Sequence, residues 1–506
     1  MSGIFIGTDT DGVHQELLLK RANRHGLVAG ATGTGKTVTM QILAEGFSKA
    51  GVPVFVADVK GDVSGLSVAG SKDHKLHDKL ISRAEKIGLE DYAYQAFPTI
   101  FWDLYGEKGH PVRTTIAEMG PTMLTRLMDL TSAQEGVMNI AFDIADEHEW
   151  PLLDLKDLKA TLTFVAEQRK ELALEYGNIT SQSVGAIIRN LLVLDRDGAD
   201  EFFGEPALKL KDLMRTDMSG HGVISILAAD ELISHPRLYS TFLLWLLSEL
   251  FEELPEVGDP DKPKMVFFFD EAHLLFDDAP KALVQKIEQV ARLIRSKGVG
   301  IYFVTQNPSD IPNSVLSQVG NRIQHALRAY TPSEIKAIKS SASAFRANPK
   351  FKTEDVISDL GVGEALVSMM DMKGRPQIVG QTLIRPPSSR LGPATEAERK
   401  TVMERSPVGS QYDEVIDRKS AYEVLTEKRK SIAEEKAKAE EAAAKEKAKK
   451  KPKRRGRKRQ SAWEAGAKSV ARTVGGQLGR KIVGGTVGAS IGRNIMRGIL
   501  GSMMRR

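Results

Sequence analysis

The chain has 506 residues, of which 41% are hydrophobic and 27% charged, a balance typical of globular proteins with about three domains. It contains no cysteine, which excludes disulfides and thiolate metal sites and leads us to expect a reducing, cytoplasmic location. The N-terminus does not resemble a signal peptide, and the longest apolar run before the tail, residues 242–247, is too short to cross a membrane.

Positive charge is concentrated at the C-terminal end. Residues 427–506 contain 24 Lys and Arg and 7 Glu, a net charge of +17, whereas the whole chain carries +5. Residues 1–426 therefore carry −12, and the sequence predicts an acidic body with a basic tail.

Residues 30–37 match the P-loop pattern G-x-x-x-x-G-K-T, with a short apolar strand before them and a helical pattern after them. Glycines allow main-chain amides to converge on phosphate, and the following helix adds its positive N-terminal end. We expect Lys36 to reach the β- and γ-phosphates of ATP and Thr37 to bind Mg²⁺. The predicted nucleotide-binding residues are Gly30, Ala31, Thr32, Gly33, Thr34, Gly35, Lys36, Thr37 and Val38.

Apolar runs at 52–57, 223–228, 265–269 and 300–304 each end in polar residues, as in parallel strands that are buried on both faces. The long helical patterns between them predict a mostly helical insertion. The fold class is therefore α/β. We divide the chain into a P-loop part (1–62), a helical insertion (63–220), the rest of the core (221–390), a charged helical or disordered linker (391–460) and a Gly-rich basic segment (461–506).

The apolar run at 265–269 leads into Asp270, Glu271 and His273. Adjacent acids at the end of a buried strand are costly unless a cation compensates them. We expect Asp270 to hold Mg²⁺ and Glu271 to polarise the attacking water; the alternative for Asp270 is a helix N-cap. His273 is equally suited to couple the nucleotide to the substrate and to serve as a packed imidazole without a role in the reaction.

Three further side chains are candidates for the reaction. Arg295 ends an amphipathic helix, where it suits either an arginine finger that acts on a neighbouring subunit or a cation favoured by the helix dipole. Gln306 follows the strand at 300–304 and is expected to sense the γ-phosphate or to orient water, unless it merely begins a turn before Pro308. Arg322 suits a second finger or a cation on the surface of a strand.

The tail leaves several uses open. Residues 451–459 contain seven cations, which suits a nucleic-acid backbone or a solvated run without structure. Glycines recur every four residues after it, in a segment too short to span a membrane. Attachment to anionic lipid and association between tails are both compatible with this pattern.

These motifs lie at residues 26–37, 270–273, 295–300 and 305–306. Together they resemble the HerA-like branch of the HerA/FtsK ATPases, and the resemblance spans roughly residues 5–390 and continues into the Gly/Arg-rich end. The resemblance implies a RecA-like core with mainly parallel strands, an additional strand beside the Walker strand, and a homo-hexameric ring that hydrolyses ATP at its interfaces. It assigns phosphate and metal to Lys36 and Thr37, metal and water to Asp270 and Glu271, sensing to Gln306 and the trans-acting finger to Arg295. Asp58 is expected to help at the phosphates.

In one respect the sequence departs from archaeal HerA. Only 29 residues precede Gly30, too few for the N-terminal β-barrel of those DNA-end-processing motors, so partnership with a nuclease is not expected. The leading hypothesis is a hexameric Mg-ATP-driven DNA translocase or helicase-like protein. The alternatives are a secretion- or conjugation-type pump near a membrane and a nucleotide-gated assembly scaffold.

Overall fold

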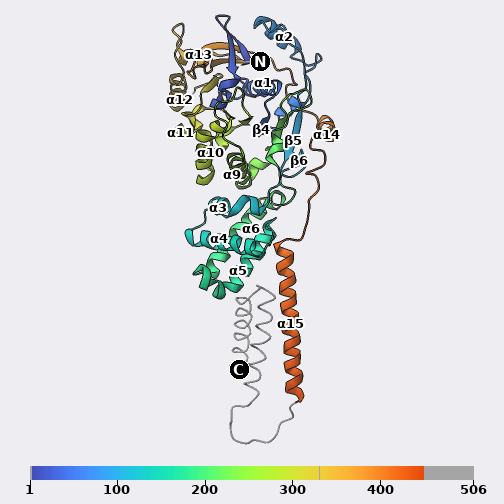
Figure 1. Ribbon diagram of the computed structural model, residues 1–506. Coiled ribbons are helices and arrows are strands. Elements are labelled where there is room, and N and C mark those ends of the chain that lie inside the picture. Colours follow the sequence, from blue (N-terminus) through green and yellow to red (C-terminus); the bar gives the residue numbers. More distant parts are fainter. Residues whose placement is uncertain (1–2, 278, 330, 450–506) are drawn as a thin grey trace. The chain divides into compact units, whose positions relative to one another are not determined.

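The computed structural model describes residues 3–277, 279–329 and 331–449 (Figure 1). The chain divides into two compact units, residues 1–114 with 194–416 and residues 115–193 with 417–506. The predicted basic run at 451–459 and the Gly-rich segment at 461–506 lie outside the described residues.

A single sheet of twelve strands forms the centre of the first unit. Its order is β2 (His14–Leu18), β1 (Gly3–Asp9), β12 (Gly380–Ile384), β11 (Glu364–Ser368), β10 (Asn321–Gln324), β3 (Gly26–Ala29), β9 (Val299–Thr305), β8 (Met265–Phe269), β4 (Val54–Asp58), β7 (Ile224–Ala228), β5 (Thr99–Asp103) and β6 (His110–Pro111).

The strands from β10 to β6 run parallel to one another, whereas β2, β1, β12 and β11 form an antiparallel edge. The strand that leads into the P-loop, β3, is separated from the strand that ends at Asp270, β8, by β9. This is the additional strand that the resemblance implied, and the mainly parallel, RecA-like α/β class is confirmed.

Both faces of the parallel strands are buried, which explains their continuous apolar sequences. On one face Phe47 of α1 (Lys36–Lys49) packs on Phe268 and Tyr302, with ring centroids 6.2 and 5.6 Å apart. On the other face Phe55 packs on Phe242 of α9 (Pro236–Glu253) at 6.5 Å. The apolar run at 242–247, too short to cross a membrane, thus lies in a buried helix.

The remaining elements of the first unit are short or peripheral. The helices are α2 (His77–Lys86), α7 (Ala199–Phe202), α8 (Leu210–Leu213), α10 (Lys281–Leu293), α11 (Asn313–Leu316), α12 (Pro332–Ser343), α13 (Thr353–Asp359) and α14 (Glu396–Glu404). The 3₁₀ turns are η1 (Leu19–Arg24), η2 (Val63–Ser67), η3 (Leu232–Ser234), η4 (Ala272–Leu275), η5 (Ile294–Lys297) and η6 (Pro308–Asp310).

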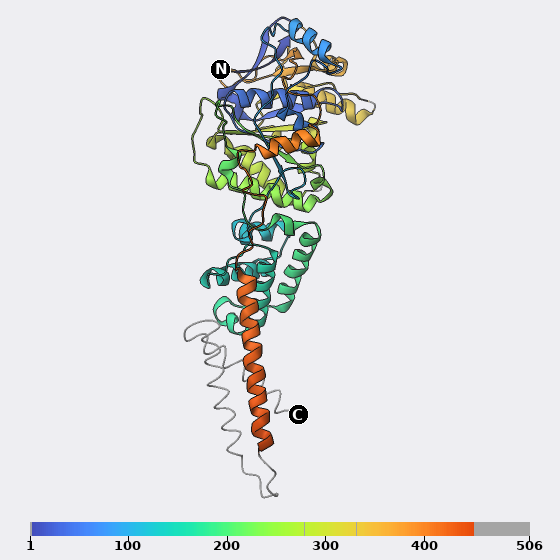
Figure 2. The same ribbon diagram turned by 90° about the vertical axis from the view of Figure 1, so that its right-hand side faces the viewer.

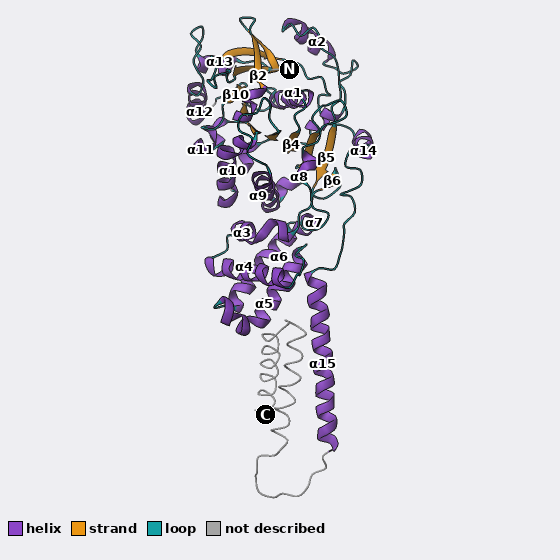
Figure 3. Cartoon of the chain, in the orientation of Figure 1, coloured by secondary structure: helices purple, strands orange, loops and turns teal. Residues whose placement is uncertain are grey.

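Figure 3 shows that the described part of the second unit consists of helices and loops. Its helices are α3 (Ile116–Leu127), α4 (Ser132–Glu147), α5 (Leu155–Tyr176), most of α6 (Ser181–Arg196) and α15 (Ala421–Lys449). The helical segment is shorter than the predicted insertion at 63–220, because β5 and β6 extend the sheet and β5 is buried along its whole length. No helix of the described residues has the length and apolar character that a membrane crossing requires.

Residues 385–416 wrap around the first unit, and we call them the strap. Figure 2 shows α14 of the strap, in orange, on the outside of this unit. Its Val402 and Met403 pack against the core on the same face as α1. Farther along, Tyr412 is fully buried beside Trp102, with ring centroids 5.4 Å apart. The first part of the predicted linker is therefore built into the sheet-containing unit.

Candidate functional site

The P-loop joins β3 to α1 at the carboxyl edge of the parallel strands. Gly30, Gly33 and Gly35 have φ values of 153°, 78° and 115°, a region that favours glycine. At Gly30 space also excludes a side chain, because an added Cβ would lie 2.5 Å from the Cβ of His325. A glycine turn before a helix N-terminus is a structure that binds phosphate.

The predicted phosphate residues lie together at this turn. The ammonium of the buried Lys36 donates hydrogen bonds to the carbonyls of Gly30 (2.7 Å) and Ala31 (3.2 Å). Burial and the charge of Lys60 lower the pKa of Lys36, and this effect is opposed by Glu271 and Asp270. The Lys36 ammonium therefore lies within electrostatic reach of both carboxylates that the sequence predicted.

The acidic half of the site lies at the ends of β4 and β8. Ligand oxygens of Asp58, Asp62 and Asp270 lie within 4.8 Å of one another, and a hydrogen bond joins Asp62 to the hydroxyl of Thr37. Burial is the main cause that raises the pKa of Asp58 to about 7 and that of Asp270 to about 6. The three carboxyl groups thus crowd one another in a poorly hydrated place.

This donor set fits Mg²⁺. Asp270 Oδ2 and Asp62 Oδ1 are buried and have no hydrogen-bond partner among the described residues. Magnesium prefers hard oxygen ligands such as carboxylates and hydroxyls, and a cation would offset the repulsion between the acids. Asp270 and Thr37 therefore lie where the sequence placed the metal, and Asp62 joins them.

Glu271 is held on strained backbone, with φ 45° and ψ 50°. Its carboxylate is 5% exposed and contacts the ammonium of Lys60, Gln306 Nε2 (3.3 Å) and His273 Nδ1 (3.3 Å). Burial raises the pKa of Glu271, but Lys60, Gln306 and His273 outweigh it, so that this pKa lies below its ordinary value. The group is therefore a carboxylate at neutral pH, and both Gln306 and His273 act on it.

Residues around the end of β10 and the start of β11 contact the P-loop and the first turn of α1. The ring of His325 bridges Thr39 Oγ1 (2.8 Å, Nε2) and the carbonyl of Glu364 (2.9 Å, Nδ1). The N–H of Ala31 donates to Ala326, and the N–H of Gly363 donates to Thr34 at 3.0 Å. The loop conformation thus depends on contacts that come from residues about 300 positions away in sequence.

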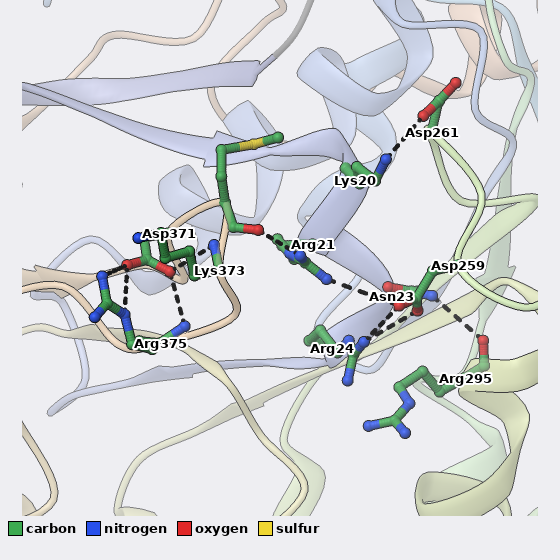
Figure 4. A network of polar contacts seen from close by, with 11 residues as sticks. Lys20, Arg21, Asn23, Arg24, Asp259, Asp261, Arg295, Asp371, Lys373 and Arg375 are labelled. Atoms are coloured by element: carbon green, nitrogen blue, oxygen red, sulfur yellow. Dashed lines mark hydrogen bonds and ion pairs between the residues drawn. The ribbon is translucent and has the colours of Figure 1, made fainter.

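Arg295 lies in η5, before β9 begins, at the opposite edge of the sheet from the P-loop. Figure 4 shows that its carbonyl accepts a hydrogen bond from Asn23 (3.3 Å), while no drawn contact reaches its guanidinium. The side chain is exposed, and Arg24 beside it is already paired with Asp259 at 2.8 Å. The structure does not bring Arg295 to the phosphate site of its own chain.

Arg322 also lies apart from the acidic cluster. It is on β10, donates to the carbonyl of Leu316 (3.0 Å), and lines a cavity of about 650 Å³ together with Pro308 and Phe345. Burial lowers the pKa of Arg322. Its role as a second finger stays a prediction.

Comparison with known proteins gives the family. The model described as "Helicase HerA-like C-terminal" matches residues 4–506. The chain belongs to this family. The match confirms the resemblance to the HerA-like branch of the HerA/FtsK motor ATPases that the motifs indicated.

Among relatives of this HerA-like chain is the DNA double-strand break repair helicase HerA of Sulfolobus acidocaldarius, 22% identical over 377 residues. The match covers 72% of this chain and 66% of the relative, slightly less than two thirds of its length.

Two solved structures are similar to the chain at TM-scores below 0.5. The bacterial conjugative coupling protein TrwBdeltaN70 is 15% identical, with a TM-score of 0.48 over 77% of this chain and 92% of that one. VirB4 of Thermoanaerobacter pseudethanolicus is 17% identical, with a TM-score of 0.47 over 78% and 98%.

Sequence reasoning missed three residues of the HerA-like site. Asp62 and Lys60 belong to the segment Asp-Val-Lys-Gly-Asp, which begins at the last residue of β4. This alternation of acids and a cation at a strand end was the available signal. His325 gave no such signal, because its importance depends on the pairing of β10 with β3, which the sequence does not reveal.

Proposed function

We propose that this chain is a motor ATPase that hydrolyses ATP with Mg²⁺. The observation that carries the proposal is Glu271, an ionised and nearly buried carboxylate at the same sheet edge as Lys36 and the acidic cluster. A site that only bound nucleotide would not need such a group, whereas hydrolysis needs one that orients water and accepts its proton.

The residues divide the reaction as follows. Asp270 and Thr37, with Asp62 beside them, would hold Mg²⁺. The bound ion would supply positive charge to the phosphate oxygens. Lys36 would stabilise the β- and γ-phosphates. Glu271 would take the proton of the attacking water as the new oxygen–phosphorus bond forms and the bond to ADP breaks, with Gln306 holding the carboxylate in place.

We extend the proposal to a hexameric ring. The position of Arg295 at the edge opposite its own P-loop supports this, because an exposed guanidinium there is placed to serve another subunit. Arginine fingers that act in trans stabilise the charge of the transition state on a neighbour's nucleotide.

We further propose that the ring acts on DNA, in line with the function named for the Sulfolobus relative. The test measures phosphate release by the full chain with Mg-ATP, with and without duplex DNA or anionic vesicles. The comparison is a chain ending at residue 449, which retains every described helix and strand. Glu271→Gln is the inactive control.

The outcomes separate the candidate functions. Stimulation by DNA that survives the truncation supports a motor whose ATPase body contacts DNA. Stimulation by vesicles alone would favour the membrane-associated pump instead. Nucleotide binding without turnover under any of these conditions would leave only the scaffold and would refute the ATPase proposal.

A further inference from the structure

Lys60 occupies a fixed turn at the end of β4. Asp58 accepts the N–H groups of Gly61 (2.9 Å) and Val63 (3.1 Å), and Gly61 has a φ of 73°. Since β4 and β8 are adjacent and parallel, with Ala57 opposite Phe269, this turn faces the residues that follow Phe269. The backbone therefore presents the Lys60 side chain directly to Glu271.

The two oxygens of the Glu271 carboxylate have different partners. Oε2 contacts Gln306 Nε2 and His273 Nδ1, each at 3.3 Å. Oε1 contacts the ammonium of Lys60, and within the described residues it has no hydrogen bond from any other group. Without Lys60, one oxygen would stay anchored and the other would be free to accept a proton.

Lys60 is suited to leave this contact. Its side chain is 38% exposed, whereas that of Glu271 is 5% exposed, and a lysine is a point charge on a flexible stem. Its charge also acts on Lys36, so two ammonium groups converge where the phosphates are expected. A γ-phosphate at this place would compete with Glu271 for the Lys60 ammonium.

We infer that Lys60 exchanges between Glu271 and the γ-phosphate of bound ATP, so that the proton acceptor is released only when a γ-phosphate is present. Without the γ-phosphate, as with ADP, Lys60 occupies Oε1 and excludes water from it. With ATP, Lys60 moves to the phosphate and Oε1 becomes available to the attacking water. This inference rests on the proposed ATPase function and gives that site its regulation.

The competing interpretation makes Lys60 a fixed counter-charge that only stabilises Glu271. A fixed counter-charge would affect ADP and ATP binding alike, whereas an exchanging lysine affects only nucleotides that carry a γ-phosphate. The difference appears in equilibrium binding and does not depend on turnover.

The test is a double-mutant cycle in the full chain. Wild type, Lys60→Met, Glu271→Gln and the double variant are titrated calorimetrically with Mg-ADP and with a Mg-bound non-hydrolysable ATP analogue. Lys60→Arg, which keeps the charge, and Lys262→Met, which removes an exposed lysine bonded to the carbonyls of Ala50 and Gly51, are the controls. Thermal unfolding confirms that each variant folds.

We expect Glu271→Gln to raise the affinity for the ATP analogue about tenfold, a coupling typical of residues in direct contact. The reason is that Lys60 no longer has to break an ion pair with a carboxylate before it binds the γ-phosphate. ADP affinity should not change. In the Lys60→Met background, Glu271→Gln should leave the analogue affinity unchanged. Lys60→Met alone should lower the affinity for the analogue and leave the affinity for ADP unchanged. Lys60→Arg should keep the wild-type preference for the analogue over ADP.

Equal tightening by Glu271→Gln with and without Lys60 would overturn the inference, because simple repulsion between carboxylate and phosphate would explain it. So would equal effects of Lys60→Met on ADP and the analogue. If the wild type hydrolyses ATP but the cycle is additive, the inference alone fails. If the folded wild type binds no nucleotide, the proposed function fails and this inference fails with it.

Discussion

Gln306 Nε2 lies 3.3 Å from Oε2 of Glu271, so the amide at the end of β9 restrains the carboxylate at the end of β8. The two strands are paired in parallel, which brings their carboxyl ends to the same edge. The side chain that the sequence predicted to sense the γ-phosphate thus acts, in this structure, on the predicted proton acceptor.

Replacing Gln306 by Ala should slow hydrolysis. Loss of the amide leaves Oε2 to His273 alone, so the carboxylate is less well oriented, and kcat should fall about 10- to 100-fold while KM changes little. The measurement is steady-state phosphate release over a range of ATP concentrations. Gln318→Ala, on a half-buried side chain just after α11, is the matched control. Unchanged kcat in Gln306→Ala would show that Glu271 needs no such restraint.

The ends of β3, β4, β8 and β9 could be predicted because buried parallel strands carry a clear local signal, an apolar run that stops at polar residues. The α/β class and the phosphate and acidic residues follow from that signal. Support from distant segments could not be predicted. His325 reaches the P-loop through the pairing of β10 with β3, and the strap reaches α1 through Arg385 and Glu45, each across about 300 positions. The sequence pattern of residues 63–220 is mostly helical, and the strand β5 within it was not predicted. With only five residues, β5 is too short to stand out from that pattern.

Replacing His325 by Ala should weaken both the fold and nucleotide binding. The variant leaves Thr39 Oγ1 and the Glu364 carbonyl without their partner, which costs about 1–3 kcal/mol for a buried group. The ring also joins α1, which follows the P-loop, to β11, so its loss should loosen the nucleotide-binding loop. Urea unfolding and calorimetric ADP titration measure the two effects. His14→Ala, at an exposed position, is the control, and equal effects of the two variants would refute a role for His325.

Acid should destabilise the fold through His25. This fully buried ring accepts the N–H of Ile301 at Nδ1 (3.0 Å) and donates from Nε2 to the carbonyl of Ala291 (2.7 Å), an arrangement that requires the neutral form. Burial lowers the pKa of His25 to about 4. Because the folded-state pKa lies below the unfolded value, the stabilisation is complete above about pH 6.5 and is lost as the pH falls toward 4.

The expected loss from this group is about 2 kcal/mol between pH 7 and pH 5. Asp58 and Asp270, whose pKa values are raised, contribute with the opposite sign in this window, so the wild type alone does not isolate His25. His25→Asn, which tolerates the φ of 57° at this position, removes the titrating group and leaves the two acids in place. Urea unfolding at both pH values should show a smaller acid loss in the variant. Equal losses would exclude His25.

The strap should prove essential to the ATPase unit. Arg385 Nη2 lies 3.1 Å from Glu45 Oε2, and Ser389 donates to Oε1 of the same buried carboxylate. Arg385→Met leaves Glu45 without its cation and should cost about 3–5 kcal/mol in urea unfolding. Adding Glu45→Leu should recover much of the loss, because both charges are then gone. Arg375→Met, which breaks the exposed pair with Asp371, should have a much smaller effect.

Arg295 provides the test of a shared site. Arg295→Ala and Glu271→Gln should each abolish most turnover. Arg295→Ala removes the guanidinium that acts on the adjacent subunit, and Glu271→Gln removes the proton acceptor of the subunit's own site. In an equimolar mixture of the two variants, about a quarter of the interfaces of a closed ring combine an intact Glu271 with an intact Arg295. Phosphate release should therefore recover in the mixture, after incubation long enough for subunits to exchange.

Arg292→Ala, on an exposed side chain three residues earlier, is the control and should stay active alone. If Arg295→Ala loses turnover but no mixing ratio restores it, while labelled subunits are seen to exchange, Arg295 does not act across an interface. Its loss would then have to be explained within its own chain, where the structure places it at the wrong edge of the sheet.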